Sequence, residues 1–562
     1  MQANFFGDEL VTTRRTFVGQ LAALPAIAVL PRWREIPELI LFNGDFLTQD
    51  VATPRAQAIA IANGHILAVG TNADMRALGG AGTRTVDLGG RVVIPGVIDA
   101  HNHPSYAGVR HLKEVDCDLR SVGAIQAALR ERAARTPAGQ WIMGFKYDDT
   151  KTAERRFLTR ADLDAVSTTH PIYVEHRGGH TAYVNSLAFE RAGVTESTPD
   201  PVGGRFERDA VTGKLSGRVA EAAAGVIGRA NATKYSRADL QAGVAEISRR
   251  LAAAGVTSAT EAQGSPDDLR AYQDARDAGE LRTRIYCHLN DSYLDRMIAS
   301  GVRTGLGDEW VRVGAVKCLA DGSISERTAR LSEPYIGRPK DYGILVNDAD
   351  ALWPTFQKAH KAGWQIGTHA NGDFAIDLVA TLYERLQREM PRRDPRFRFE
   401  HCTVLTPDLI RRIKALGAIP TPFASYVYFH GEKMGEYGAA RTERMFPMRW
   451  FLDAGIPATM GSDYPPGPFE PMMALTSMIT RTDIRGTTWG ASQRITFAEA
   501  LKVLTVNGAY ASYEERIKGS LTAGKLADLV VLKADPRTVP AIEIVNVGIE
   551  RTMVGGRWVY ES

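Results

Sequence analysis

Short apolar runs alternate with longer segments of helical composition along most of this 562-residue chain. The runs are rich in β-branched residues and end at polar side chains, as parallel strands do where they meet their loops. The eight runs are the stretch that ends at His101, followed by 255–261, 283–289, 311–319, 365–369, 397–403, 418–422 and 457–462. Most lie roughly 20 to 50 residues apart, which leaves room for one helix per strand and predicts a (β/α)8 barrel.

Both chain ends contain further short strands joined by tight turns. The predicted strands are 38–42, 58–62, 65–69, 85–88 and 91–94 before the barrel, and 529–532, 545–547, 551–554 and 557–560 after it. Asn63-Gly64 is a strong hairpin signal, and Gly89-Gly90 and Gly555-Gly556 mark two more turns. Neither end has enough strands for a stable sandwich, so we expect the two ends to form one discontinuous β-sandwich domain. Two separate small β caps are the alternative, and each would expose more strand edges.

The segment between the first and second barrel strands is too long for a single connecting helix. It has strand patterns of its own at 140–145 and 171–176, so we expect an insertion domain over the barrel mouth. The predicted fold class is therefore α/β, with a barrel, a discontinuous sandwich and an insertion after the first barrel strand. The predicted division is an export signal and linker at 1–34, the sandwich at 35–94 and 517–562, the barrel at 95–104 and 251–516, and the insertion domain at 105–250.

Composition excludes several classes of partner. Lys and Arg number 68 and Asp and Glu number 65, which leaves a formal net charge of +3. Because no long basic run accompanies this balance, nothing indicates a nucleic acid or another polyanion. The four cysteines are far apart and form no C-x-x-C pair, so a zinc knuckle or a disulfide framework is not expected.

The first thirty residues have a different character from the rest. Arg14-Arg15 precedes a short apolar stretch at 21–30, and Ala26-Ile27-Ala28 lies within that stretch. This arrangement resembles a twin-arginine export signal and predicts a periplasmic protein. The apolar stretch is too short for a stable membrane span. The alternative is a frayed tail on a cytoplasmic enzyme.

Two histidines at the end of the first barrel strand are the starting point for the chemistry. His101 and His103 are two residues apart, and side chains alternate between the faces of a strand, so both point the same way. Such a pair can hold a divalent metal from one side, although an isolated His-x-His is more often an ordinary surface or core feature. Four further strand ends carry polar residues of this kind, namely Lys317, His369, His401 and Asp463. Because the carboxyl ends of barrel strands lie at one face, we expect all six side chains to converge.

The motifs around these residues resemble those of one known superfamily. They are Pro-Gly-x-Ile-Asp-Ala-His-x-His (95–103), Lys-x-x-x-Asp-Gly-Ser (317–323), Thr-His-Ala-x-Gly-Asp (368–373), Glu-His-Cys (400–402) and Gly-Ser-Asp (461–463). Together with the tail at 519–531, they make nearly the whole chain after the signal similar to the amidohydrolase superfamily, in the branch that includes N-substituted formamide deformylase. One position departs from the pattern, because relatives commonly have Gln-Pro after the seventh strand and this chain has Thr421-Pro422. The departure bears on the substrate rather than on the metal site.

The resemblance implies a metal-dependent hydrolase barrel with two divalent metal ions, for which zinc is the expected element. Four histidines would be shared between the metals, His101 and His103 on one and His369 and His401 on the other. Lys317 would be carbamylated and would bridge both metals, since an amine that captures carbon dioxide becomes a carboxylate-like anion. The alternative from the residues alone is an ion pair between Lys317 and Asp321 beside a single metal.

The resemblance also implies roles for residues that act on the substrate. Asp463, a further metal ligand, would be the general base that takes a proton from a metal-held attacking water and delivers one to the leaving nitrogen. Its alternative is a structural aspartate that caps a loop. His180 and Arg177, in a polar segment of the insertion, could reach the substrate or could have ordinary surface roles. The aromatic segment 423–430 could wall an apolar pocket or could pack in the core.

These residues predict an enzyme that hydrolyses a carbon–nitrogen bond other than a peptide bond, in an amide or an N-substituted formamide. The expected partner is a small-molecule substrate with an apolar portion, and a homodimer is left open. Ester, lactone or carbamate hydrolysis at the same metals is the alternative within enzymes, because a fold does not fix a reaction. A catalytically silent binding protein is the alternative outside enzymes. Asp463 argues against that alternative, since a binding protein needs no base beside a metal.

The twin-arginine hypothesis generates a first prediction. Replacing Arg14 and Arg15 by Lys should leave a folded, active enzyme in the cytoplasm, because the export route requires the arginine pair. Cell fractionation of the variant and the parent measures the outcome. If both proteins are found in the same compartment, the export hypothesis is wrong.

Overall fold

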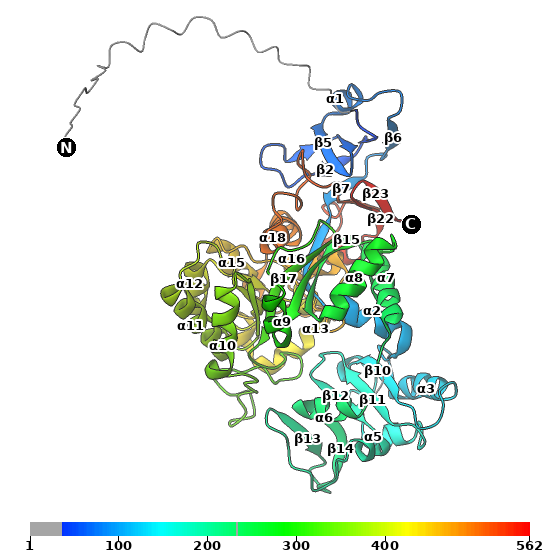
Figure 1. Ribbon diagram of the computed structural model, residues 1–562, viewed down its shortest axis with the longest axis vertical. Helices are drawn as coiled ribbons and strands as arrows, with labels where there is room; N and C mark the ends of the chain where they lie inside the picture. The colour runs from blue at the N-terminus through cyan, green and yellow to red at the C-terminus, as the bar shows by residue number, and fades with distance from the viewer. Residues whose placement is uncertain (1–35, 232–233) are drawn as a thin grey trace, which may run out of the picture.

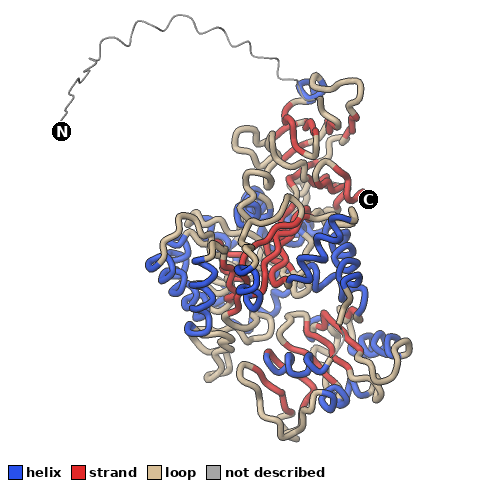
Figure 2. Tube along the Cα trace, in the orientation of Figure 1, coloured by secondary structure: helices blue, strands red, loops and turns tan. Residues whose placement is uncertain are grey.

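The computed structural model describes residues 36–231 and 234–562, so the predicted export signal lies outside the described residues. A sheet domain, a barrel and an insertion follow one another along the long axis of the molecule (Figure 1). Figure 2 shows the strands gathered in these three places, with most helices around the barrel. Within the described ranges, every helix is too short or too polar to cross a membrane.

The sheet domain is built from both ends of the chain. Its first sheet has the order β5 (His65–Gly70), β4 (Ala58–Ala62), β1 (Leu39–Phe42) and β6 (Arg84–Asp87). Its second sheet has the order β23 (Arg557–Glu561), β22 (Ile549–Val554), β21 (Leu529–Leu532), β7 (Val92–Pro95), β2 (Asp45–Leu47) and β3 (Arg55–Ala56). The C-terminal strand β21 thus pairs directly with the N-terminal strand β7, in an antiparallel register that sets Val531 opposite Val93.

One apolar core lies between the two sheets. Leu39 and Leu41 alternate inward from β1, and Leu529 and Val531 do so from β21. All four are nearly or completely buried and belong to the same cluster. Because each chain end supplies only part of this cluster, the sandwich forms only when both ends are present.

The barrel is a parallel sheet whose neighbouring strands follow the chain order. Its strands, in the order in which they pair, are β8 (Val97–Asn102), β15 (Val256–Gly264), β16 (Arg284–Asn290), β17 (Val311–Leu319), β18 (Ile366–Ala370), β19 (Arg398–His401) and β20 (Ile419–Thr421). The segment predicted as the eighth strand, 457–462, has no regular strand assignment. It nevertheless closes the ring, because Ala100 N–H donates to Met460 on one side and Thr459 N–H donates to Pro420 on the other.

Several of the helices after the barrel strands are amphipathic and have clear start signals. The barrel part contains α2 (Pro104–Lys113), α7 (Arg237–Ala253), α8 (Pro266–Asp277), α9 (Leu294–Ala299), α10 (Ala349–Lys361), α11 (Asp373–Glu389), α12 (Pro407–Leu416), α13 (Tyr426–Met434), α14 (Ala439–Thr442), α15 (Met448–Asp453), α16 (Pro471–Thr480), α17 (Phe497–Leu504) and α18 (Val506–Ala511). A capping box opens α8, where Ser265 and Asp268 each accept the other's backbone N–H. The buried faces of these helices cover the outside of the sheet and complete its core.

The insertion contains a separate six-stranded sheet. Its order is β13 (Gly204–Arg208), β14 (Leu215–Glu221), β12 (Thr181–Val184), β11 (Ile172–His176), β10 (Ile142–Tyr147) and β9 (Val115–Asp116). The accompanying helices are α3 (Val122–Ala133), α4 (Arg160–Asp164), α5 (Ser186–Arg191) and α6 (Ala222–Ala230). The sheet domain contains the short helix α1 (Asn72–Arg76). The chain leaves the barrel after α2 and returns to it at α7, so the insertion follows the first barrel strand as predicted.

The passage from sheet domain to barrel occurs at a single glycine. Gly96 separates β7 from β8, and a Cβ atom at this position would lie 2.1 Å from Oγ1 of Thr257 on β15. Only glycine therefore allows the two strands of the barrel to approach here. Nearby, the buried side chains of Arg284 and Asp528 form two hydrogen bonds of 2.8 and 3.0 Å, which join the start of β16 to the sheet domain.

The fold class is confirmed, and one predicted strand of the sheet domain is wrong. The run 545–547 was expected to be a strand, but the chain forms a 3₁₀ helix over Ala541–Asn546. Such a short apolar run does not distinguish the two structures, and here Ile544 is buried against the core that includes α16. The very short strands β2 and β3 were not predicted.

The shared sandwich core generates a second prediction. Deleting residues 517–562 removes β21 from the middle of its sheet, and each lost core side chain such as Leu529 or Val531 represents ~1.5–3 kcal/mol of burial. We expect insoluble protein, measured by sedimentation of the lysate. The matched control deletes only 557–562, the edge strand β23, and should remain soluble. A soluble 517–562 deletion that unfolds cooperatively would show that the two ends fold independently.

Candidate metal centre

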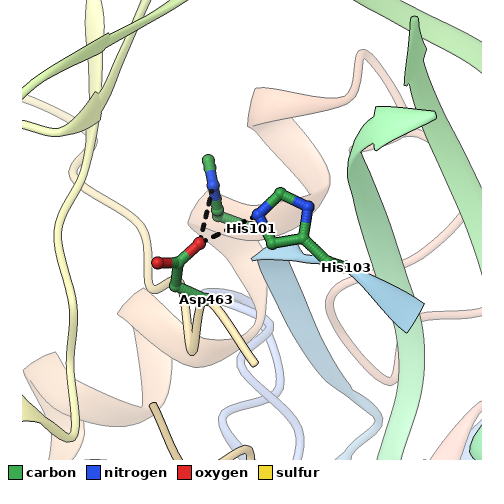
Figure 3. A group of neighbouring side chains, drawn as sticks. All are labelled: His101, His103 and Asp463. Carbon is green, nitrogen blue, oxygen red and sulfur yellow. Dashed lines mark hydrogen bonds and ion pairs between the residues drawn. The ribbon is translucent and has the colours of Figure 1, made fainter. Parts of the chain in front are cut away.

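The ends of the first strand and of the eighth segment bring three ligand-type side chains together. His101 lies near the end of β8, His103 at the start of α2, and Asp463 directly after 457–462. Oδ1 of Asp463 lies 3.1 Å from Nε2 of His101 and 3.1 Å from Nε2 of His103 (Figure 3). The predicted convergence of these three residues is therefore present in the structure.

His101 is held by a buried carboxylate on the opposite side of its ring. Nδ1 of His101 donates to Oε2 of Glu400 at 2.6 Å, and Arg398 in turn donates to both oxygens of Glu400. Because the carboxylate only accepts, the ring proton lies on Nδ1 and the lone pair lies on Nε2. Nε2 of His101 and Oδ1 of Asp463 are then two acceptors at hydrogen-bond distance, an arrangement that a cation between them would satisfy.

His103 also lies between two carboxylates. Its Nδ1 lies 3.6 Å from Oε1 of Glu261, and its Nε2 faces Asp463. Burial alone would lower the pKa of His103, but hydrogen bonds to Asp463 and Glu261 outweigh burial and raise it to about 9. This attraction for positive charge is the electrostatic property that a divalent metal would use.

His369 and His401 lie beside this group. The ring centroids of His101 and His401 are 4.6 Å apart, and those of His369 and His401 are 4.5 Å apart. Burial lowers the pKa of both His369 and His401 well below the ordinary value, so both are neutral, which is the form that binds metals. Phe423 stacks on His401 with centroids 4.4 Å apart and fixes that ring.

Lys317 lies inside the same cluster. Its Nζ is 3.4 Å from Nε2 of His101, and burial lowers its pKa from the ordinary value, which favours the neutral amine that carbamylation requires. Asp321 is the partner that the alternative hypothesis assigns to Lys317. Its carboxylate instead accepts hydrogen bonds from the backbone N–H groups of Asn371 and Gly372, both at 2.9 Å. In the described part of the chain, no ion pair joins Lys317 to Asp321.

The backbone of the site is strained at two of these positions. His401 has φ = 69° and Asp463 has φ = 55°, values that non-glycine residues adopt at a cost of about 1–3 kcal/mol. His401 is the last residue of β19 and Asp463 directly follows the segment 457–462, so at both positions the chain has to turn while the side chain still faces the mouth. The surrounding packing therefore holds these two side chains in place against their local preference.

A cavity of about 690 Å³ opens from this cluster between barrel and insertion. The barrel contributes His103, Lys317 and Asp463 to its wall, and the insertion contributes Arg177 and His180. Arg177 is buried and forms an ion pair with Asp118, whereas His180 is partly exposed toward the cavity. A smaller hollow beside it is lined by Phe423, Tyr426 and His430, so part of the aromatic segment does face the site.

A second group of ligand-type side chains occurs where the insertion meets α13. Ligand atoms of Asp148, Asp149 and His176 lie within 4.8 Å of one another. Here the chain supplies its own cation, because Nζ of Lys433 lies 3.3 Å from Asp148, and His176 also hydrogen-bonds Glu326 at 2.7 Å. This group is best described as a buried ion-pair network that fastens the insertion to the barrel.

The sequence analysis missed the carboxylates behind the histidines. Glu261 ends the predicted strand 255–261, so its position at a strand end was a signal that could have identified it. Glu400 faces the barrel interior, where it contacts His101, and the next residue, His401, reaches the same centre because its positive φ breaks the strand alternation. Thr421, the departure from the superfamily pattern, accepts a 3.3 Å hydrogen bond from Arg398 and thus supports Glu400 from the next strand.

Fold and site together define a (β/α)8 barrel protein with a candidate metal centre at the carboxyl ends of its strands. A model of the amidohydrolase family matches residues 84–560, and the chain belongs to this family. It is therefore a hydrolase whose family and donor set are those of metal-dependent enzymes.

Named relatives match almost the whole chain. It is 28% identical over 541 residues to the N-substituted formamide deformylase of Arthrobacter pascens, covering 94% of this chain and 99% of that protein. It is also 28% identical over 535 residues to the putative amidohydrolase YtcJ of Bacillus subtilis, covering 93% and 99%. An uncharacterized metal-dependent hydrolase from Pyrococcus furiosus has the same fold, with a TM-score of 0.70 at 23% identity over 89% of this chain and 99% of that chain.

The donor set fits divalent metal ions. Imidazole nitrogens of neutral rings and a buried carboxylate are ligands of zinc and similar metals, and carboxylates behind His101 and His103 provide the supporting contacts that such ligands usually have. The assignment of His101, His103, Asp463, Lys317, His369 and His401 as ligands remains a prediction, as does the number of metals.

The position of Lys317 generates a third prediction. Replacing Lys317 by Ala should remove one or both metals, because the bridging anion is lost, and elemental analysis of the purified protein measures this. Acetate or propionate should restore metal content in a dose-dependent way, since a short carboxylate fits the space left by the side chain. Lys361→Ala, at the exposed end of α10, is the control and should keep the parental metal content. If Lys317→Ala retains both metals without added acid, Lys317 is not a ligand.

Proposed function

We propose that the protein is a metal-dependent hydrolase that cleaves the carbon–nitrogen bond of an amide or N-substituted formamide. The observation that carries this proposal is the placement of Oδ1 of Asp463, 3.1 Å from both His101 and His103, on the wall of the large cavity. A carboxylate in this position is both near the candidate metal ligands and open to a substrate. The likeness to a protein named N-substituted formamide deformylase supports the choice of substrate class.

Two divalent metals, with zinc expected, would be held by the four site histidines, Asp463 and a carbamylated Lys317. Such ions, when bound, polarise a carbonyl group and lower the pKa of a water molecule. Glu400 and Glu261 hold His101 and His103 so that one nitrogen of each ring remains directed at Asp463. The chain itself thus supplies the orientation of the ligands.

Asp463 is suited to act as the general base. Burial would raise its pKa, but the imidazoles of His401, His101 and His103 around the carboxylate outweigh burial and hold the pKa well below the ordinary value. The carboxylate is therefore ionised and ready to take the proton of the attacking water, and it can then deliver a proton to the leaving nitrogen. An amide nitrogen is a poor leaving group without this proton, so the same residue would serve both steps.

The insertion would complete the site from above. His180 reaches the same cavity as Asp463, and its ring centroid is 5.6 Å from that of His369. We assign His180 a contact with the substrate, opposite the barrel ligands. The cavity wall also includes Tyr106, Tyr173 and Leu240, which suit a substrate with an apolar portion.

Turnover of Asp463→Asn gives the fourth prediction. The substitution is nearly isosteric, so we expect a folded protein that retains most of its metal and loses at least ~100-fold in kcat on amides or formamides that the parent hydrolyses. Assays should use matched panels of N-substituted formamides, other amides, esters, lactones and carbamates, with metal content measured in parallel. Ester turnover without amide turnover in the parent would move the assignment to the alternative reaction.

Asp348→Asn provides a matched control for this experiment. Asp348 is the N-cap of α10, where Asn is as good a cap as Asp, so kcat should not change. If Asp463→Asn at full metal content turns over as fast as the parent, Asp463 is not the base.

A further inference from the structure

His180 enters the cavity from a tight turn between β11 and β12. The turn is made at Gly179, whose φ of +79° is in the left-handed region. The side chain of His180 is 18% exposed, and its Nε2 has no hydrogen-bond partner among the described residues. The imidazole therefore presents one free ring nitrogen beside the candidate metal ligands and the base.

Glu221 holds the other side of this ring. Nδ1 of His180 donates to Oε2 of Glu221 at 2.8 Å, and the backbone N–H of Glu221 donates to the carbonyl oxygen of His180 at 2.7 Å. The two residues are 41 positions apart: His180 directly precedes β12, and Glu221 is the last residue of the neighbouring strand β14. The double contact fixes both the backbone and the ring of His180.

The conformation of Glu221 is not explained by the local fold. Its φ of 51° and ψ of −123° lie in a region that favours glycine, yet the position carries a large charged side chain. Glu221 occupies the N-cap position of α6, but its side chain does not cap that helix. It is turned to His180 instead, and its second oxygen, Oε1, is buried without a partner. An unfavourable backbone and an unsatisfied carboxylate oxygen indicate a role other than stabilising the insertion.

We propose that Glu221 is a positioning residue that holds His180 so that Nε2 of His180 donates a hydrogen bond to the carbonyl oxygen of the substrate. The ion pair with Glu221 favours the imidazolium form of His180, in which Nε2 carries a proton as well as Nδ1. The carboxylate also keeps the ring from rotating away, so a directed donor is in place before the substrate binds. This inference rests on the proposed function for the identity of the acceptor, but the orientation of His180 by Glu221 does not. The insertion is then part of the catalytic apparatus as well as a cover for the cavity.

Glu221→Gly separates this role from a structural one. Glycine relieves the left-handed backbone and removes the buried carboxylate, so the melting temperature should stay the same or rise. The kcat on a formamide or amide that the parent hydrolyses should nevertheless fall by about 100-fold, because the donor is no longer held in place, with a smaller change in KM. Metal content, measured in the same preparation, should equal that of the parent.

A double-variant comparison tests whether the two residues act as one unit. His180→Ala should lower kcat at least as much as Glu221→Gly, and the double variant should be no slower than His180→Ala alone. Glu207→Ala is the matched control, because Glu207 bonds Arg218 on the neighbouring strand of the same sheet and does not line the cavity. This control should leave kcat unchanged.

A crystal structure of Glu221→Gly gives a readout that does not depend on turnover. We expect the His180 ring to take up new or multiple orientations while His101, His103 and Asp463 remain in place. An unmoved His180 ring, an unchanged kcat, or losses that multiply in the double variant would each overturn the positioning role. If the parent turns over none of the tested amides and formamides but the ring moves as expected, the proposed function fails while the positioning role stands.

Discussion

The buried contact between Arg398, Glu400 and His101 is the interaction on which the geometry of the site depends. Arg398 and Glu400 are completely buried, and breaking such a pair by removing one partner costs about 3–5 kcal/mol. Arg398 also donates to the carbonyl oxygen of Ala100 at 2.6 Å, so the network reaches from β19 to β8 across the barrel interior. These two strands are not neighbours in the sheet. β20 and the segment 457–462 lie between them, and 457–462 has no regular strand assignment. The network therefore orients His101 and helps to close the barrel at the same time.

The three parts of the molecule contribute different things to this centre. The barrel supplies the candidate ligands, which converge because every strand ends at the same face. The sheet domain lies at the opposite ends of the strands, where Arg284 and Asp528 join it to the barrel. The insertion covers the mouth and adds His180, and the ion-pair network around Asp148 and Lys433 fastens it there. The cavity is thus bounded by segments that are more than one hundred residues apart in the chain.

Membership of the amidohydrolase family identifies the reaction class as hydrolysis but does not identify the substrate. At 28% identity, the matches to the formamide deformylase and to YtcJ cover nearly the full length of this chain and of both proteins. The substrate is determined by the cavity wall, much of which comes from the insertion. Thr421, which departs from the superfamily pattern, is absent from this wall and instead supports Arg398. Its effect on substrate choice would therefore act through the orientation of His101 rather than by direct contact.

The sequence by itself determined the family, the barrel and the candidate ligands at its strand ends, because strand periodicity and short motifs are local properties. The run 545–547 shows the limit of such reasoning, since two valines on either side of an asparagine fit a strand or a helix and packing against distant elements decides between them. The hydrogen-bond partners of the site residues could not be predicted from the sequence either. Glu400 with His101 and Glu221 with His180 are pairs of residues 299 and 41 positions apart, and only the folded sheets bring them together. Local sequence therefore predicts which side chains carry chemistry, whereas the tertiary structure decides which carboxylate orients each of them.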